Sequence, residues 1–184
     1  MLKRRVAADL DAGFVHLVDD FGDMVVGIAR RLGDPGAADD AVQETFMRAY
    51  RDLRSRDTER LAELELRPWI ATIARNVVRN EWRRRSRRPT SSLDQDDTAA
   101  WVVHGENSTE DAVVGASQLE HLACLLERLP ATQREAVVLR HVVGLSTRET
   151  ADVLGCPTGT VKSHLSRGLA AMRSALHAAS QEPA

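Results

Sequence analysis

Apolar residues recur at helical spacing through the N-terminal half of the chain. From Phe14 to Leu32 they fall at intervals of three and four residues, which predicts an amphipathic helix. The next residues, Gly-Asp-Pro-Gly at 33–36, predict a turn. A second helix is predicted from about Ala37 to Arg54, followed by a charged connector up to Leu66. The core-facing residues of this second helix are Val42, Phe46, Ala49 and Leu53.

A third helix is predicted from Pro68 to a point just before Pro89. Proline is tolerated in a first helical turn and stops a helix that would run into it. The apolar side of the helix is expected to hold Trp69, Ile70, Ile73, Ala74, Val77 and Trp82. The polar side, named here the basic face, holds Arg75, Asn76, Arg79, Asn80, Arg83 and Arg84. Guanidinium groups neutralise phosphates and aromatic rings stack on unpaired bases. The helix is therefore either a nucleic-acid contact or a solvated basic helix with its tryptophans in the core.

The C-terminal half carries the most specific pattern, a helix-turn-helix. Two helices are predicted before it, Gln118–Leu129, which Pro130 ends, and Thr132–Val143, which Gly144 caps. Ser146 and Glu149 have the spacing of a capping box, and Gly155 ends the short helix that they begin. Cys156-Pro157 blocks continuation, and Thr158 is expected to cap the last helix. The buried stripe of that last helix is expected to be Val161, Leu165, Leu169, Met172 and Leu176.

The opposite side of the last helix predicts contact with DNA. From Thr158 to Arg173 there is no acidic residue, so phosphates are not repelled. Lysine, arginine and serine side chains also reach base edges in a major groove. The residues expected to do so, named here the readout face, are Lys162, Ser163, Ser166 and Arg167. The alternative is a plain packing unit of two short helices.

Together these elements predict an all-α protein of two small helical domains. The expected boundaries are residues 1–88 and 116–180, with a flexible acidic linker at 89–115. The 184 residues suffice for two such domains, and the low aromatic content of 4% favours helices over sheets. Within the linker, Trp101-Val102-Val103 is the only apolar cluster, which is either a docking point or a loosely packed patch.

The net charge of −2 does not itself indicate nucleic-acid binding, but the charges are segregated. Residues 67–88 contain eight arginines and one acid, whereas residues 89–111 contain six acids and no lysine or arginine. The N-terminus is positively charged but has no apolar run behind it, so no secretory signal is expected there. No segment approaches the apolar length of a membrane span, and a cytoplasmic protein is therefore expected.

The two cysteines are too few for a disulfide scaffold, which favours a reduced protein. His121 and Cys124 have metal-ligand spacing, but the sequence offers no second ligand pair. A buried thiol is the favoured interpretation of Cys124. No metal site and no cofactor are expected.

Several spaced motifs resemble the extracytoplasmic-function (ECF) group of bacterial sigma factors, within the sigma-70 family. Asp40, Gln43, Glu44 and Phe46 are similar to the family's D-x-x-Q-E-x-F segment. The stretches 67–70 and 73–76 are similar to its tryptophan-containing W-[LI]-x-x-I-A-R-N segment. The remaining similarities, to sigma domain 4, are at 129–130, 134–135, 138–140, 144–146, 149–151 and 159–163. Two departures, Asn80 where aspartate is frequent and His164 where arginine is frequent, affect the promoter sequence rather than the class.

The resemblance implies a role in transcription initiation. It implies that residues 1–88 form sigma domain 2 and residues 116–180 sigma domain 4. Domain 2 would dock on the β′ coiled coil of core RNA polymerase through Asp40, Gln43 and Glu44, named here the docking surface. It further implies that the basic face grips and melts the −10 element, while the connector at 54–66 captures a flipped base. Domain 4 would read the −35 element through the readout face, with Arg148, Thr158 and Thr160 on phosphates. The β subunit and an anti-sigma factor are further implied partners, and the acidic linker would thread the polymerase cleft.

Two other classes of function are weighed against a promoter-specificity subunit. A stand-alone helix-turn-helix regulator, binding operators as a dimer, would leave the third helix and the docking surface without a role. An enzyme is disfavoured because there is no nucleophile elbow, zinc motif, phosphate loop or pair of carboxylates in an apolar cleft. No small-molecule substrate is therefore expected.

Overall fold

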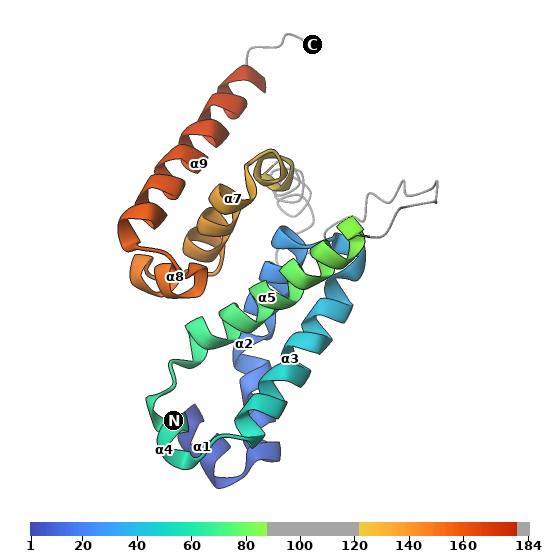
Figure 1. Ribbon diagram of the computed structural model, residues 1–184, viewed down its shortest axis with the longest axis vertical. Coiled ribbons are helices and arrows are strands. Elements are labelled where there is room, and N and C mark those ends of the chain that lie inside the picture. The colour runs from blue at the N-terminus through green and yellow to red at the C-terminus, as the bar shows by residue number, and fades with distance from the viewer. Residues whose placement is uncertain (88–121, 180–184) are drawn as a thin grey trace, which may run out of the picture.

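The computed structural model describes residues 1–87 and 122–179, and these residues form helices and turns without any strand. The predicted all-α fold of two small helical domains is confirmed. Residues 1–87 are called the N-terminal domain below, and residues 122–179 the C-terminal domain (Figure 1). The predicted linker with its Trp101 cluster lies outside the described residues, so the exact domain boundaries remain predictions.

Three long helices build the N-terminal domain. They are α2 (Leu10–Leu32), α3 (Ala38–Arg54) and α5 (Leu66–Arg87), and each packs on the other two (Figure 1). Leu17, Ile28 and Ile70 are fully excluded from solvent in this core. The α2 helix begins earlier than the apolar pattern predicts, because the Asp9 carboxylate accepts a hydrogen bond from the Ala12 amide at 3.1 Å and caps it.

Three short elements connect and cover these helices, and the sequence pattern predicted none of them as helical. They are α1 (Leu2–Ala8), the 3₁₀ turn η1 (Pro35–Ala37) and α4 (Thr58–Glu63). Helix α1 packs closely on α2, since a Cβ at Gly13 would lie only 2.5 Å from the Cα of Val6. Helix α4 lies within the predicted connector and is capped by Asp57, whose carboxylate accepts from the Arg60 amide at 2.8 Å.

Helix α5 is longer than the core that it covers. Ile70, Ala71 and Ala74 are buried, but no residue of α5 described beyond Val78 is buried. Trp82, expected on the apolar side, is instead 68% exposed. The expectation was wrong because the periodic pattern continues past the point where α2 and α3 supply packing partners.

The C-terminal domain consists of a helical segment at 122–127 followed by α7 (Ala131–Val137), η2 (Val138–Val142), α8 (Thr147–Leu154) and α9 (Thr158–Ala179). The single helix predicted from Thr132 to Val143 is α-helical only up to Val137. It continues as one π-helical turn, in which the Val143 amide donates to the Val138 carbonyl at 2.9 Å. Gly144 then ends it with a φ of 76°, as predicted for a C-terminal cap.

The helix-turn-helix formed by α8 and α9 has the predicted caps at its first helix. The Glu149 amide donates to the Ser146 hydroxyl at 3.1 Å, and the Ser146 amide donates to the Glu149 carboxylate at 2.7 Å. Hydrogen bonds to the Glu149 carboxylate from the Ser146 side chain and from the Ser146 amide lower the pKa of Glu149. Gly155 ends α8 in the left-handed region with a φ of 66°. Helix α9 begins at Thr158 itself, so Pro157 occupies the position where Thr158 was expected as the cap.

Helix α9 packs on α7 and α8 through part of its apolar stripe. Val161 and Met172 are buried, whereas Leu176, expected in the same stripe, is 43% exposed because it lies near the end of the helix. Gly168 permits the approach to α7, since a Cβ at this position would lie 3.0 Å from a methyl carbon of Val137.

Candidate nucleic-acid and polymerase interfaces

The readout face is presented to solvent along one side of α9. Lys162, Ser163, Ser166 and Arg167 are all exposed. Two of them are held by the helix itself. The Ser163 hydroxyl donates to the Gly159 carbonyl at 3.0 Å, and Arg167 Nε donates to the Ser163 carbonyl at 3.2 Å. A rigid helix therefore carries a row of donors without any carboxylate.

The residues expected to contact DNA phosphates lie outside the readout face. Arg148 of α8 and Thr158 are exposed, and Thr160 is half-buried. His164, where the family frequently has arginine, is half-buried rather than part of the exposed row. The side chain at this position therefore lies beside the readout face rather than within it.

The basic face lies on α5, and this α5 basic face is only partly available to a nucleic acid. Asn76, Arg79, Asn80, Arg83 and Arg84 are exposed, as predicted for its members. Arg75 is not, because its side chain is turned into the C-terminal domain and only 8% of the residue is exposed. The structure thus separates one arginine from a set that the sequence places on a single face.

The docking surface lies at the start of α3. Asp40 and Gln43 are exposed. The half-buried Glu44 forms an ion pair with Arg48, one helical turn further on, with 2.6 Å between Glu44 Oε1 and Arg48 Nε. Gln43 and the half-exposed Met47 also line an open apolar hollow between α2 and α3. The other residues lining this hollow are Phe14, Phe46, Tyr50 and Arg51. Polar groups at the edge of an apolar hollow are typical of a protein-binding surface.

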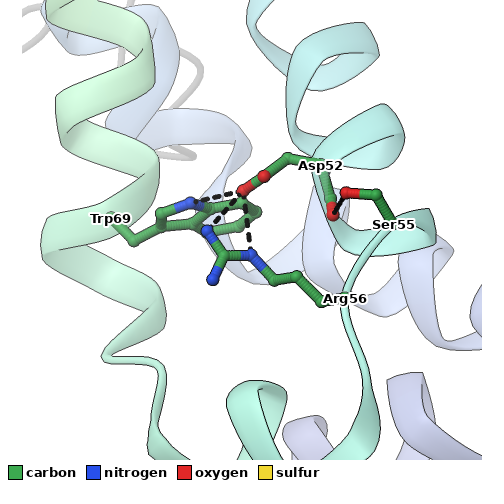
Figure 2. A network of polar contacts seen from close by, with 4 residues as sticks. All are labelled: Asp52, Ser55, Arg56 and Trp69. Carbon is green, nitrogen blue, oxygen red and sulfur yellow. Dashed lines mark hydrogen bonds and ion pairs between the residues drawn. The ribbon is translucent and has the colours of Figure 1, made fainter.

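A polar cluster anchors the connector to α5, and Figure 2 shows its members. The Asp52 carboxylate accepts hydrogen bonds from Trp69 Nε1 at 3.0 Å and from Arg56 Nε and Nη2 at 3.0 and 2.8 Å. The Arg56 guanidinium lies 5.9 Å from the centroid of the Trp69 ring. The Trp69 indole is thereby fixed between α3 and the connector.

Sequence reasoning missed two contacts that join the domains. Arg75 pairs with Glu135 of α7, and Arg67 donates to the carbonyl of Val143. Glu135 and Arg67 both stand in stretches that resemble the sigma family, but their spacing in the chain contains no signal that they meet residues of the other domain. Only the three-dimensional arrangement brings them to the same interface.

Metal binding and membrane spanning find no support in the part of the chain that the structure describes. Residues 1–87 and 122–179 contain no cluster of three potential metal ligands. Cys124, expected to be buried, is exposed, and His121 lies outside the described ranges. None of the described helices has both the length and the apolar character required to cross a bilayer.

Comparison with known protein families gives two matches, one in each half of the chain. Residues 17–88 match sigma-70 region 2, and residues 119–172 match sigma-70 region 4. Both halves of a sigma factor are therefore present in the expected order, which does not support a stand-alone helix-turn-helix regulator.

Two relatives extend this likeness to the whole chain. The ECF RNA polymerase sigma factor SigW of Bacillus subtilis is 31% identical over 188 residues, covering 96% of this chain and 97% of SigW. The RNA polymerase sigma factor CnrH of Cupriavidus metallidurans is 30% identical, covering 99% of this chain and 96% of CnrH.

Solved structures show the same arrangement of helices. CnrH in complex with the cytosolic domain of CnrY superposes with a TM-score of 0.68 at 25% identity, covering 96% of both chains. RpoE of Bartonella quintana, in complex with the anti-sigma factor NepR, gives 0.70 at 25% identity, covering 89% of this chain and 96% of RpoE. Neither described domain makes up half of the 184 residues, so scores of this size require both domains to superpose together. The chain belongs to the extracytoplasmic-function group of the sigma-70 family of RNA polymerase sigma factors.

Proposed function

We propose that this sigma factor acts in the cytoplasm as a promoter-specificity subunit, which binds core RNA polymerase and directs it to a set of promoters. The observation that carries the proposal is the readout face, an exposed and acid-free row on the second helix of a capped helix-turn-helix. The polymerase would supply the chemistry of RNA synthesis, and this chain would supply the recognition of DNA.

The division of labour follows the two domains. The docking surface on α3 would contact the β′ coiled coil, with the adjoining hollow accepting an apolar side chain of the partner. The α5 basic face would contact the −10 element, and the readout face the −35 element as duplex, with Arg148, Thr158 and Thr160 on phosphates. Two weak sites on one polymerase gain affinity through effective concentration.

An anti-sigma factor is proposed as the second protein partner. RpoE was solved in complex with the anti-sigma factor NepR, and CnrH in complex with the cytosolic domain of CnrY. Both superpose on 89% or more of this chain. A partner that holds the two domains in the arrangement seen here would keep Arg75 covered by the C-terminal domain and away from a promoter.

Run-off transcription tests the proposed function directly. Core polymerase with this protein is expected to produce discrete transcripts from a pool of genomic promoter fragments, and core polymerase alone is not. A mixture in which the chain neither associates with core polymerase nor changes the transcripts would contradict the proposal.

Replacing Arg167 by alanine is expected to weaken recognition at a single position of the −35 element. Arg167 lies on the exposed row with its Nε on the Ser163 carbonyl, and an arginine paired with a base contributes about 1–3 kcal/mol to recognition. Transcription from promoters substituted at each −35 position measures the loss. An equal loss at every position would instead make Arg167 a phosphate contact.

A further inference from the structure

One carboxylate oxygen fixes the point where the connector at 54–66 leaves α3. Trp69 Nε1 and the Nε and Nη2 of Arg56 all donate to the same atom, Asp52 Oδ2 (Figure 2). The backbone carbonyl of Asp52 accepts a hydrogen bond from the Ser55 hydroxyl at 2.8 Å, at the C-terminal end of α3. Asp52 therefore joins three parts of the N-terminal domain, which are the end of α3, the first residues of the connector and the start of α5.

Other contacts hold the rest of the connector against the domain. Leu61 and Leu66 are buried in the core, and Lys3 Nζ of α1 donates to the Ala62 carbonyl at 3.0 Å. The middle and the far end of the connector are thus fixed by packing and by α1. The Asp52 contacts fix its first residues, and they do so against α5 in particular.

The Asp52 contacts lie at one end of the α5 basic face. Trp69, Asn76 and Asn80 follow one another at helical spacing, so their side chains leave α5 on the same side. Asn76 and Asn80 are exposed, and Trp69 is half-buried. A nucleic-acid strand that followed this side of the helix would therefore meet the connector where Asp52 anchors it.

The ion pair in this cluster is better suited to setting geometry than to adding stability. The side chains of Arg56 and Asp52 are 28% and 40% exposed, and an ion pair so open to water contributes little to folding. Three hydrogen bonds to one carboxylate oxygen nevertheless restrict the Trp69 indole and the Arg56 guanidinium to one arrangement. Loss of the carboxylate would free both side chains without unfolding the domain.

We propose that Asp52 is a positioning residue for recognition of the −10 element, which acts by holding the connector in one place beside the α5 basic face. The inference rests on the proposed function, since it takes this face as the surface that meets the −10 element. A connector that is already ordered loses little conformational entropy when DNA binds, whereas a loose one must be ordered at that moment. A base that fits the ordered connector is then distinguished from one that does not, because the connector cannot rearrange to accept both.

The test uses full-length variants assembled with core polymerase. D52N removes the negative charge and keeps the size of the side chain, and W69F removes the indole donor and keeps an aromatic ring. The double variant D52N/W69F combines the two changes. Asp19, an exposed acid of α2, supplies the matched control D19N with the same change in charge as D52N. The folding of each protein is measured by circular dichroism.

The promoter that gives the strongest run-off transcript from the genomic pool serves as the probe. Each base of its −10 element, and separately of its −35 element, is replaced in turn. Discrimination is the transcript level from the original promoter divided by that from the substituted one. This ratio does not change when a variant merely contains less active protein, so a loss of stability alone leaves it unaltered.

D52N and W69F are each expected to lower discrimination about fivefold or more at one or more positions of the −10 element, the size expected for loss of a charge-assisted hydrogen bond. Discrimination at the −35 element is expected to stay at the wild-type level. The double variant is expected to lose no more than D52N alone, because both changes break the same contact. D19N is expected to match the wild type.

Unchanged discrimination at every −10 position in both folded single variants would overturn the proposal. So would an equal fall at the −35 element, an equal fall in D19N, or a double variant whose loss is the product of the two single losses. Failure of the wild type to produce any transcript would instead reject the proposed function, and with it the role of Asp52. Normal transcription with unchanged discrimination rejects the positioning role alone.

Discussion

Replacing Gln43 by alanine together with Glu44 by arginine is expected to weaken binding to core RNA polymerase at least about 100-fold. The docking surface presents a carboxylate and an amide from one turn of α3, which fits a basic partner. An arginine placed against such a partner costs several kcal/mol, and every 1.4 kcal/mol is about a tenfold change in affinity. Titration of labelled protein with core polymerase, in the absence of DNA, measures the change.

The double variant is expected to remain folded. Gln43 is exposed, and Glu44 loses only its surface ion pair with Arg48, where two like charges one turn apart cost about 0.2–0.5 kcal/mol. Glu59→Arg, at an exposed position of α4, makes the same change in charge away from the docking surface. Wild-type affinity in the double variant, or an equal loss of affinity in Glu59→Arg, would show that the docking surface on α3 is not part of the polymerase interface.

Ile70→Ala is expected to lower the free energy of unfolding by about 2–5 kcal/mol, the usual cost of emptying a fully buried aliphatic site. Ile70 has 0% exposure and belongs to the buried cluster that includes residues of both domains. Urea unfolding followed by circular dichroism measures the loss.

Val15 supplies the control for this substitution, because its side chain is 59% exposed on α2. Val15→Ala is expected to change the free energy of unfolding by no more than about 0.5 kcal/mol. If Ile70→Ala costs no more than Val15→Ala, then Ile70 does not pack in the core as described.

The long elements were predictable because each depends on a signal local to its own stretch of sequence. Periodic apolar residues predicted α2, α3 and α5, and the Ser146–Glu149 spacing predicted the capping box that the structure confirms. Helix α1 was missed because a helix of seven residues with one buried side chain, Val6, has too few apolar positions to show a period. The π-helical turn η2 was missed for a related reason, since its residues fit an α-helical pattern equally well.

The candidate sites differ in the same way, because some depend on signals within one helix and others on contacts between domains. Exposure of the readout face follows from the position of its residues opposite a buried stripe on one helix. The burial of Arg75 does not, because it depends on Glu135 and Val153, which belong to another domain. The expected burial of Trp82 was wrong because the apolar stripe that includes Trp82 continues along α5 beyond the helices that could cover it. Patterns within one helix predict which side chains share a face, and contacts between domains decide which of them meet solvent.

Gly168 gives α9, the helix that carries the proposed readout face, a point of adjustment inside the protein. A single added methyl group would press on Val137, which must yield by a few tenths of an ångström or push α9 outward from α7. The neighbouring residue, Arg167, would be carried along with the backbone. If the readout face reads DNA as proposed, base preference would drift over evolution through interior substitutions that leave every residue of that face unchanged.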